Sequence, residues 1–344
     1  MRSQSLKDYA RRWITIRDKP GPVESAATSL LCIGLVLVTW HLLTVGVPEE
    51  RVVDPITLPS LGDTFRSFHS LWFERELSRS AVGSLGRVVG GFFLAAIIGV
   101  PLGLAAGSFL RLNAFLKPFS IFGRNIPIAA LIPLTLIWFG IGETQKVMFI
   151  FLACVAFVFF DSVNAVQEVP NNYLDAAYTL GARFVPRPGL LRALLAGVGY
   201  AAVFLSAYYF LSARPVDNDG AEMMAAWRTR GAIVTGSGFL LGVLLWFPIL
   251  AFQPLYKVLL PLAMPGVTNS LRLLFGLAFG YIMLAEVINA KFGIGYIINQ
   301  SQRQGPREHI YLALILIALL AFGIDRGILA VQRWFFPYRQ MGEH

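Results

Sequence analysis

Long apolar runs separated by short polar stretches dominate the chain from residue 26 onward. A transmembrane helix needs about 20 mostly apolar residues to cross a hydrocarbon layer about 30 Å thick. Eight runs satisfy this requirement, at residues 26–47, 84–108, 115–140, 147–166, 190–212, 231–252, 264–287 and 310–331. The pattern therefore predicts an all-α, polytopic membrane helix bundle with about eight spans.

Small residues recur at four-residue spacing inside these runs, which places them on one helix face and lets helix backbones approach closely. These sets are Gly86 and Gly90; Gly99, Gly103 and Gly107; Gly238 and Gly242; and Gly276 and Gly280. Prolines inside spans free backbone carbonyls that neighbouring groups must satisfy. Kinks are therefore expected at Pro101, Pro127, Pro133 and Pro248.

Composition agrees with a membrane protein. Of the 344 residues, 56% are hydrophobic and 14% are charged, whereas soluble proteins have roughly 25% charged residues. The net charge of +9 would suggest nucleic acid in a soluble chain. In a membrane chain the basic residues first indicate topology, so a nucleic-acid partner is not expected.

The basic residues that precede the first run indicate a cytoplasmic N-terminus. They are Arg2, Lys7, Arg11, Arg12, Arg17 and Lys19. A cleaved signal peptide would end in small residues, but Pro48-Glu49-Glu50 follows the run instead, so we expect an uncleaved first span. Eight crossings then return the C-terminus to the cytoplasm.

Several kinds of chemistry are absent from the sequence. Cys32 and Cys154 lie in apolar runs and the four histidines are scattered, so neither a disulfide scaffold nor a metal site is predicted. No Gly-x-x-x-x-Gly-Lys-Ser/Thr phosphate loop occurs. We therefore expect a chain that is not an enzyme and binds no cofactor. Its energy would come from an ion gradient or from a partner that hydrolyses nucleotide.

Charges inside membrane spans mark functional sites by default, because burial of an unpaired charge in a bilayer is costly. They are Arg124, Asp161, Arg272, Glu286, Asp325 and Arg326. Arg272 and Glu286 lie on a similar side of one span, about 21 Å apart, so they cannot pair with each other. We take Arg124, Arg272 and Glu286 as candidates for a translocation pathway. The alternative is that each bonds neighbouring groups and fixes packing.

The polar stretch between the fourth and fifth spans, residues 168–183, predicts a short capped helix. Asn171 or Asn172 can cap its start, and Asp175 can lie in its first turn, where the helix dipole favours an acidic group. Gly181 can end the helix in a left-handed conformation. Ala177 and Gly181, four residues apart, would form a small-residue stripe for a partner protein.

Here the sequence resembles a known family. Asp175-Ala176-Ala177-x-x-x-Gly181 is similar to the "EAA" loop of ABC importer permeases, with Asp in place of Glu, and Val258-Leu259-Leu260-Pro261 is similar to the end of that loop. In this chain 76 residues separate Gly181 from Val258, where the family has about nine. The excess contains two predicted spans joined by the polar stretch 213–230. Because two crossings return the chain to the same side, the two halves of the loop can still meet.

Other segments resemble the nitrate, sulfonate and taurine branch of this family. They are Leu58-Pro59-Ser60, Ser84-Leu85-Gly86-Arg87-Val88, Ile132-Pro133-Leu134, Trp138-Phe139-Gly140-Ile141-Gly142-Glu143 and Gly293-Ile294-Gly295-Tyr296. The resemblance implies a type I importer permease fold with six core spans plus an inserted two-span hairpin. Its parts would be a cytoplasmic basic N-terminus (1–25), a first permease part (26–187), the inserted hairpin (188–253) and a last part (254–344).

The resemblance also implies a function. The chain would be a homodimeric, pore-forming subunit in the bacterial cytoplasmic (inner) membrane, importing a small anion such as nitrate, sulfonate or taurine. An extracytoplasmic solute-binding protein would deliver the solute, and cytoplasmic ABC ATPase subunits would hold ATP and Mg. The residues that would couple to the ATPase are Asp175, Ala176, Ala177, Gly181, Leu260 and Pro261.

Two alternatives stay open at this point. A secondary transporter driven by an ion gradient would use Asp161, Glu286 or Asp325 as its ion site. A degenerate, non-transporting family member would explain why the insertion interrupts the coupling loop. We expect the inserted hairpin to pack on the outside of the core bundle, and the alternative is a tolerated insertion without function.

Overall fold

The computed structural model describes residue 15 and residues 20–47, 51–211, 220–304 and 306–337. Within these ranges the structure is helical, apart from loops and one antiparallel bridge between Phe184 and Phe252. The chain forms two compact units, residues 1–69 with 306–312 and residues 70–305 with 313–344. Most of the predicted cytoplasmic segment 1–25 lies outside the described residues.

The first unit contains α2 (Pro22–Thr44), α3 (Leu61–Arg66) and the first turn of α14 (Arg307–Phe335). Ser60 caps α3, because its hydroxyl accepts a hydrogen bond from the Asp63 N–H at 3.1 Å. The Trp40 indole N–H donates to the Pro59 carbonyl at 2.9 Å. The ring of Tyr311 lies 5.8 Å from that of Trp40. These contacts join the end of α2, the loop that follows it and the start of α14.

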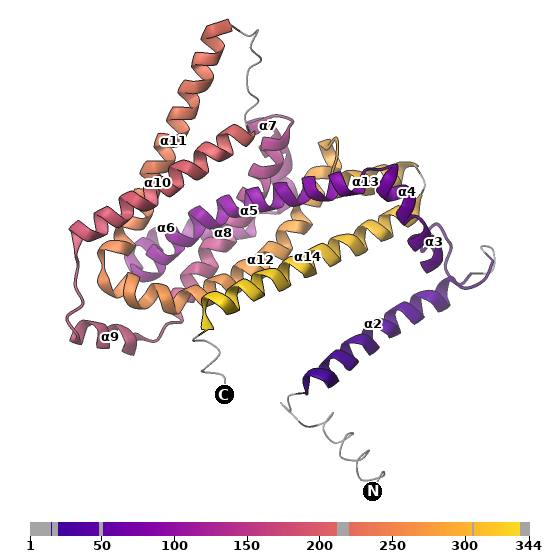
Figure 1. The fold of residues 1–344 in the computed structure, drawn as a ribbon, viewed down its shortest axis with the longest axis horizontal. Coiled ribbons are helices and arrows are strands. Elements are labelled where there is room, and N and C mark those ends of the chain that lie inside the picture. The colour runs from indigo at the N-terminus through magenta and orange to yellow at the C-terminus, as the bar shows by residue number, and fades with distance from the viewer. Residues whose placement is uncertain (1–14, 16–19, 48–50, 212–219, 305, 338–344) are drawn as a thin grey trace. The chain divides into compact units, whose positions relative to one another are not determined.

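The second unit contains the remaining helices (Figure 1), except that the first two residues of α4 (Phe68–Phe73) belong to the first unit. They are α5 (Leu77–Ser108), α6 (Leu110–Asn125), η1 (Ile128–Ala130), α7 (Leu131–Phe139), α8 (Glu143–Gln167), α9 (Asn171–Thr179), α10 (Pro186–Leu211), α11 (Gly220–Ala251), η2 (Leu255–Leu259), α12 (Leu260–Asn289), α13 (Ile294–Gln304) and most of α14.

Seven helices in the described part of the chain are long and apolar enough to cross a membrane, and each overlaps a predicted span. The eighth predicted span, 115–140, is a bent pair of helices, and the kink predicted at Pro127 is confirmed. The chain bends there by 91° between α6 and η1–α7. Ile126 is extended (φ −67°, ψ 126°) because the residue before a proline disfavours the helical conformation, and Pro127 follows.

The expected proline kinks differ in outcome. Pro101 and Pro248 lie inside α5 and α11. Pro133 lies in the first turn of α7, where an N–H has no helical partner to lose. The kink predicted at Pro133 is therefore wrong.

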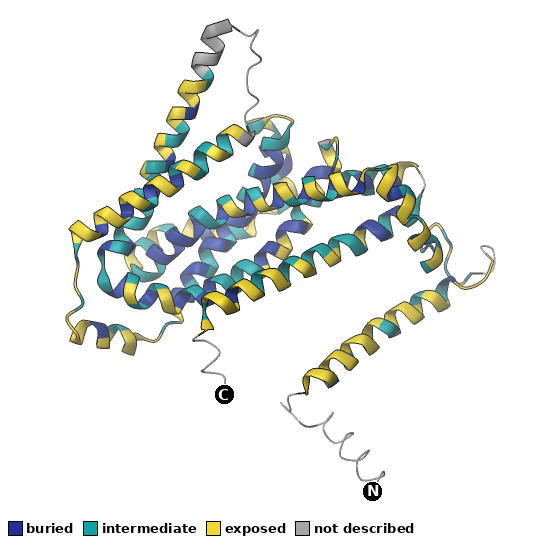
Figure 2. Cartoon of the chain, in the orientation of Figure 1, coloured by how far each residue is buried: buried dark blue, intermediate teal, exposed yellow. Residues whose placement is uncertain are grey.

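Helices α5, α8 and α12 pack together at the centre of the second unit, and their buried faces form its apolar core (Figure 2). The close approach of α5 to α8 depends on glycine. A Cβ added at Gly103 would lie 2.5 Å from Ser162 Cβ and 2.7 Å from the Phe159 carbonyl oxygen. Gly86, Gly276 and Gly280 meet nothing within 4 Å. The predicted packing role is thus confirmed for Gly99, Gly103 and Gly107 of α5. Within this chain it is not confirmed for Gly86, Gly276 and Gly280.

The inserted segment forms a helical hairpin, α10 with α11. Its helices pack on each other at glycines, and a Cβ at Gly238 would lie 2.7 Å from the Phe204 ring. Helix α11 begins at Gly220, so residues 220–230 are helical, whereas the sequence predicted a polar connection. The first part of the predicted polar stretch 213–230, up to residue 219, lies outside the described residues.

The hairpin packs beside α5 and buries less of its surface than the core does. In its apolar windows 17% of residues are buried, against 56% in α5 and 61% in α8 (Figure 2). This agrees with the prediction of a hairpin on the outside of the core bundle.

Candidate functional site

The predicted coupling helix exists as α9, which follows Pro170. Asn171 is its first helical residue and no side chain caps its start, so the predicted asparagine cap is wrong. Asp175 lies beyond the first turn, which also contradicts the prediction. The left-handed end is confirmed, because Gly181 has φ +80°. Its N–H donates to the Tyr178 carbonyl at 2.9 Å, the pairing expected for a glycine that ends a helix.

Ala177 and Gly181 do not form the predicted exposed small-residue stripe on α9. Ala177 is 7% exposed and turns toward the bundle, and Leu174 packs against the core. Asp175, Ala176 and Gly181 are exposed. A Cβ at Gly181 would meet nothing within 4 Å. The outward surface of α9 is therefore formed without Ala177, whose small size serves packing inside the chain.

The two halves of the interrupted loop lie side by side. The Val185 N–H donates to the Ala251 carbonyl at 2.8 Å, and the Gln253 N–H donates to the Arg183 carbonyl at 3.1 Å. These bonds flank the bridge between Phe184 and Phe252. The prediction that the insertion leaves the two halves together is confirmed.

The second half of the loop leads through η2 into α12, and η2 contacts α9. Leu260, the first residue of α12, packs against the core. Pro261 follows it and is exposed. Proline is tolerated there because the first N–H groups of a helix have no helical partner. The Arg192 guanidinium of α10 lies 4.5 Å from the centre of the Tyr256 ring, which ties the hairpin to η2.

A buried cluster of charges lies at the other ends of α8 and α12. Glu286 is 0% exposed. Its carboxylate accepts hydrogen bonds from the Ser84 hydroxyl and from Arg87 Nη1, both at 2.7 Å, and from the Gly295 N–H at 2.9 Å. Every donor is a neighbour that the fold supplies from α5 or α13, so the buried carboxylate is fully paired.

Arg87, which is 2% exposed, connects this carboxylate to a second one. Its Nε and Nη2 donate to the carboxylate of Glu143 at 2.5 and 2.9 Å. Its Nη1 also donates to the Phe292 carbonyl at 2.9 Å, and the guanidinium stacks 4.5 Å from the centre of that ring. Lys146 donates to Glu143 at 2.9 Å. Two cations therefore balance two carboxylates in one cluster.

The turn between α12 and α13 fits around this cluster because it contains Gly293, which has no side chain. Gly293 has φ +139°, and a Cβ there would lie 2.5 Å from the Glu286 carboxyl carbon. Segments that resemble the sulfonate and taurine branch, those containing Arg87, Glu143 and Gly293, thus converge on one polar site.

The other two candidate pathway residues lie elsewhere. Arg272 of α12 forms an ion pair with Asp325 of α14, with Nε 3.1 Å from Oδ1. The Arg124 guanidinium lies 3.4 Å from the centre of the Phe160 ring, and its Nε donates to the Ser120 carbonyl at 3.3 Å. The structure therefore does not bring Arg124, Arg272 and Glu286 together, and each contacts protein groups of its own.

Sequence reasoning missed Arg87, Glu143 and Lys146 as partners of Glu286. A signal was present, because Arg87 lies inside the predicted span 84–108 and a charge there requires a partner. Which carboxylate it meets could not be read from the sequence, since Glu286 is 199 residues away.

Comparison with known proteins relates the chain to one family of transport proteins. Residues 99–209 match the family model described as the binding-protein-dependent transport system inner membrane component. The chain is 24% identical over 309 residues to the taurine transport system permease protein TauC of Escherichia coli, covering 88% of this chain and 86% of TauC. By these matches the chain is similar to ABC importer permeases, and it is called the permease below.

A further relative is the bicarbonate transport system permease protein CmpB of Synechococcus elongatus, to which the permease is 24% identical over 262 residues, covering 76% of this chain and 70% of CmpB. Among solved structures, a chain of the MetNI methionine ABC transporter in an inward-facing conformation superposes with a TM-score of 0.51 at 18% identity. That match covers 78% of the permease and 98% of the MetNI chain. The fold is therefore that of type I ABC importer permeases, as predicted, and about a fifth of this permease lies outside it.

The family and the long apolar helices also settle where the permease resides. It is a multi-pass protein of the inner membrane. Permeases of this family act with a binding protein, as the family's description states.

Proposed function

We propose that the permease imports a small solute bearing an oxyanion group, of the nitrate, sulfonate or taurine kind, using ATP hydrolysed by separate subunits. Similarity to TauC and CmpB supports this class, since taurine carries a sulfonate and bicarbonate is itself an oxyanion. Specificity within the class would reside mainly in the external solute-binding protein.

The observation that carries the proposal is the closure of the interrupted coupling loop. The bridge between Phe184 and Phe252 brings the loop's second half back to α9 despite the insertion. Asp175, Ala176 and Gly181 are exposed beside it. An ATPase subunit would bind this surface, and Leu260 and Pro261 at the start of α12 would receive its displacement. The short, glycine-ended helix suits a rigid contact because it offers few mobile side chains.

The proposed assembly has two copies of the permease, two ATPase subunits that hold ATP and Mg, and one solute-binding protein. With α9 on the cytoplasmic side, both chain termini are cytoplasmic. The cluster of Arg87, Glu143 and Glu286 then lies at the outer end of the bundle. This orientation also agrees with the basic residues before the first span.

The two alternatives receive less support. A gradient-driven transporter needs a carboxylate free to bind an ion, and two of its three candidates, Glu286 and Asp325 but not Asp161, are each paired with an arginine. A degenerate permease was suggested by the interrupted loop. The hydrogen bonds between its two halves remove the main reason for that suggestion.

The experiment is purification of the tagged permease with its partners from mild detergent, comparing the natural chain with Gly181→Asp. An ATPase should co-purify with the natural chain and be lost with the variant, because the new carboxylate points into open space where the ATPase would bind. The matched control is Gly46→Asp, also at a glycine of positive φ with nothing within 4 Å, which should retain the ATPase. Equal ATPase recovery with all three chains would contradict docking at this surface.

Substrate class is tested separately by uptake into cells that express the whole assembly. Taurine, an alkane sulfonate, nitrate and bicarbonate are supplied in turn, with a neutral amino acid as the comparison. Uptake of at least one oxyanion above that of the neutral solute is expected. Uptake of the neutral solute alone would contradict the proposed class.

A further inference from the structure

Pro101 of α5 leaves one backbone carbonyl without its helical partner. Proline has no N–H, so the carbonyl four residues earlier, that of Ile97, loses its hydrogen bond. In this structure the Tyr200 hydroxyl of α10 donates to that carbonyl. The Trp246 indole N–H of α11 donates in turn to the Tyr200 oxygen at 3.2 Å. Both helices of the inserted hairpin therefore contribute to a chain of hydrogen bonds that ends on α5.

The hairpin holds the Tyr200 side chain firmly. Tyr200 is 8% exposed. A Cβ at Gly242 would lie 2.8 Å from the Tyr200 Cβ and Cγ atoms, so the backbone of α11 packs directly on this side chain. Trp246 lies one helical turn after Gly242 and on the same face. The hydroxyl is thus positioned by α11, and it satisfies a carbonyl inside an apolar helix, where an unpaired polar group would be costly in a membrane.

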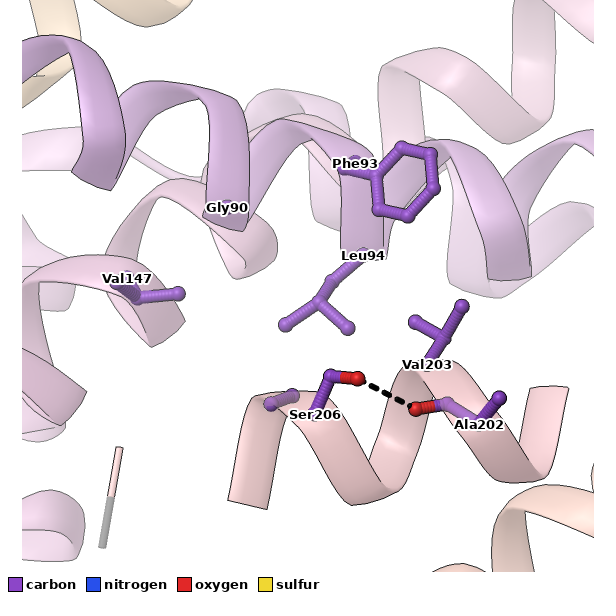
Figure 3. Close-up of a pocket in the computed structure, with 8 residues that line it drawn as sticks. Gly90, Phe93, Leu94, Val147, Ala202, Val203 and Ser206 are labelled. Atoms are coloured by element: carbon purple, nitrogen blue, oxygen red, sulfur yellow. Dashed lines mark hydrogen bonds between the residues drawn. The ribbon is translucent and has the colours of Figure 1, made fainter. Parts of the chain in front are cut away.

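Beside this link α5 and α10 separate around an apolar cavity of about 550 Å³. Figure 3 shows Leu94 of α5 and Val203 of α10 pointing into the space between the helices. Ser206 contributes a hydroxyl to the lining, but it donates to the Ala202 carbonyl of its own helix at 2.8 Å. The cavity lining therefore adds no side-chain hydrogen bond between the hairpin and α5.

The hairpin also touches α5 on the other side of Pro101. At the base of the hairpin, the ring of Phe252, the residue after α11, lies 5.5 Å from that of Phe109, the residue after α5. Phe252 is the same residue that bridges to Phe184 in the coupling loop. One rigid hairpin thus contacts α5 before and after its proline, and is joined at its base to the loop that follows α9.

We propose that the inserted hairpin is a coupling strut, with Tyr200 as a positioning residue. Displacement of the coupling loop moves the base of the hairpin, and Tyr200 transmits this movement to α5 at Ile97, next to the weak point made by Pro101. Helix α5 carries Arg87 near its other end, so the movement would reach the outer charge cluster. The strut rests on the proposed function, because it requires an ATPase that displaces the coupling loop.

The test is a double-mutant cycle of Tyr200→Phe and Pro101→Ala in the assembled transporter. Two quantities are measured, the melting temperature and the number of solute molecules imported per ATP hydrolysed. In the natural background Tyr200→Phe should lower the melting temperature by about 2 °C, the shift expected for one lost hydrogen bond in a chain of this size. Import per ATP should fall about fivefold while the ATPase still co-purifies.

In the Pro101→Ala background the new N–H at residue 101 can bond to Ile97, so Tyr200→Phe should cause a smaller loss of stability, from the Trp246 N–H alone. The matched control is Tyr208→Phe on the same helix. The Tyr208 hydroxyl donates to the Trp227 carbonyl at 2.8 Å, inside the hairpin. This control should lower the melting temperature by a similar amount but leave import per ATP unchanged.

Two results would overturn the strut. A loss of stability from Tyr200→Phe that is equal in both backgrounds would show that the hydroxyl does not serve the carbonyl freed by Pro101. Equal import per ATP for Tyr200→Phe and Tyr208→Phe would show a purely structural role. Failure of the proposed function is distinguishable, because the ATPase would then stay bound to Gly181→Asp while the stability cycle still reports on the hydrogen bond.

Discussion

The core helices α5, α8 and α12 and the inserted hairpin α10–α11 have similar apolar sequences but are held in different ways. The α5–α8 pair buries more than half of its apolar windows, whereas the hairpin buries about a sixth. Both pairs approach through glycine. The core adds a cluster of four charged groups, and the hairpin adds one chain of side-chain hydrogen bonds to α5. In a membrane, apolarity alone gives no drive for helices to associate, so small residues and polar partners decide which helices form the core.

The largest expected loss of unfolding free energy follows from removal of Arg87, which belongs to the charge cluster of the core. Arg87→Ala would leave the fully buried Glu286 without its cation, which costs about 3 to 5 kcal/mol of unfolding free energy. The control is Arg79→Ala on the same helix, whose partner Glu76 lies at 2.9 Å with both side chains more than 60% exposed. Thermal unfolding in detergent should separate the two variants clearly, and equal melting temperatures would show that the cluster does not stabilise the core.

A smaller effect is expected from adding a methyl group at packed glycines. Gly103→Ala should lower the unfolding free energy by about 1 to 3 kcal/mol, because the added carbon would overlap the rigid Phe159 carbonyl. At Gly242 the added carbon would lie 2.8 Å from the Tyr200 Cβ and 2.9 Å from the Gly197 Cα, so the overlap is smaller than at Gly103 and Gly242→Ala should cost less. The control is Gly199→Ala, which has open space and should be neutral or slightly stabilising. A larger loss of unfolding free energy from Gly242→Ala than from Gly103→Ala would show that the hairpin is packed more tightly than the core.

The smallest effect is expected for the ion pair between Arg272 and Asp325, which is partly exposed. Arg272→Gln and Asp325→Asn should each lower the unfolding free energy by about 1 kcal/mol or less. If the pair only joins α12 to α14, both variants should also import solute with the same KM. A raised KM for Arg272→Gln alone would instead place Arg272 on the translocation pathway.

The sequence predicted local features well where one residue type controls them. Gly181 adopts the left-handed conformation expected at a helix end, because glycine reaches it without steric cost. Predictions that depended on neighbours failed. Asn171 does not cap α9, since Pro170 already fixes the helix start one residue earlier. Ala177 does not face outward, since α9 packs against η2.

The same distinction holds for the candidate site. The sequence identified Glu286 as a charge of interest inside a span, and it grouped Arg272 and Arg124 with it as candidates for one pathway. The structure separates the three, because each charge took the nearest opposite charge or aromatic face on a neighbouring helix. Such pairing depends on helix rotation and depth, which apolar periodicity does not specify inside a membrane.

By itself, the sequence determined the number and length of the apolar helices, the position of the interrupted coupling loop and the likeness to importer permeases. These follow from hydrophobic length and from short motifs, both of which are local. Only the tertiary structure decided that Arg87 joins Glu143 to Glu286, and that Tyr200 bonds the carbonyl freed by Pro101. Both are contacts across 56 or more residues, and their formation depends on how whole helices pack.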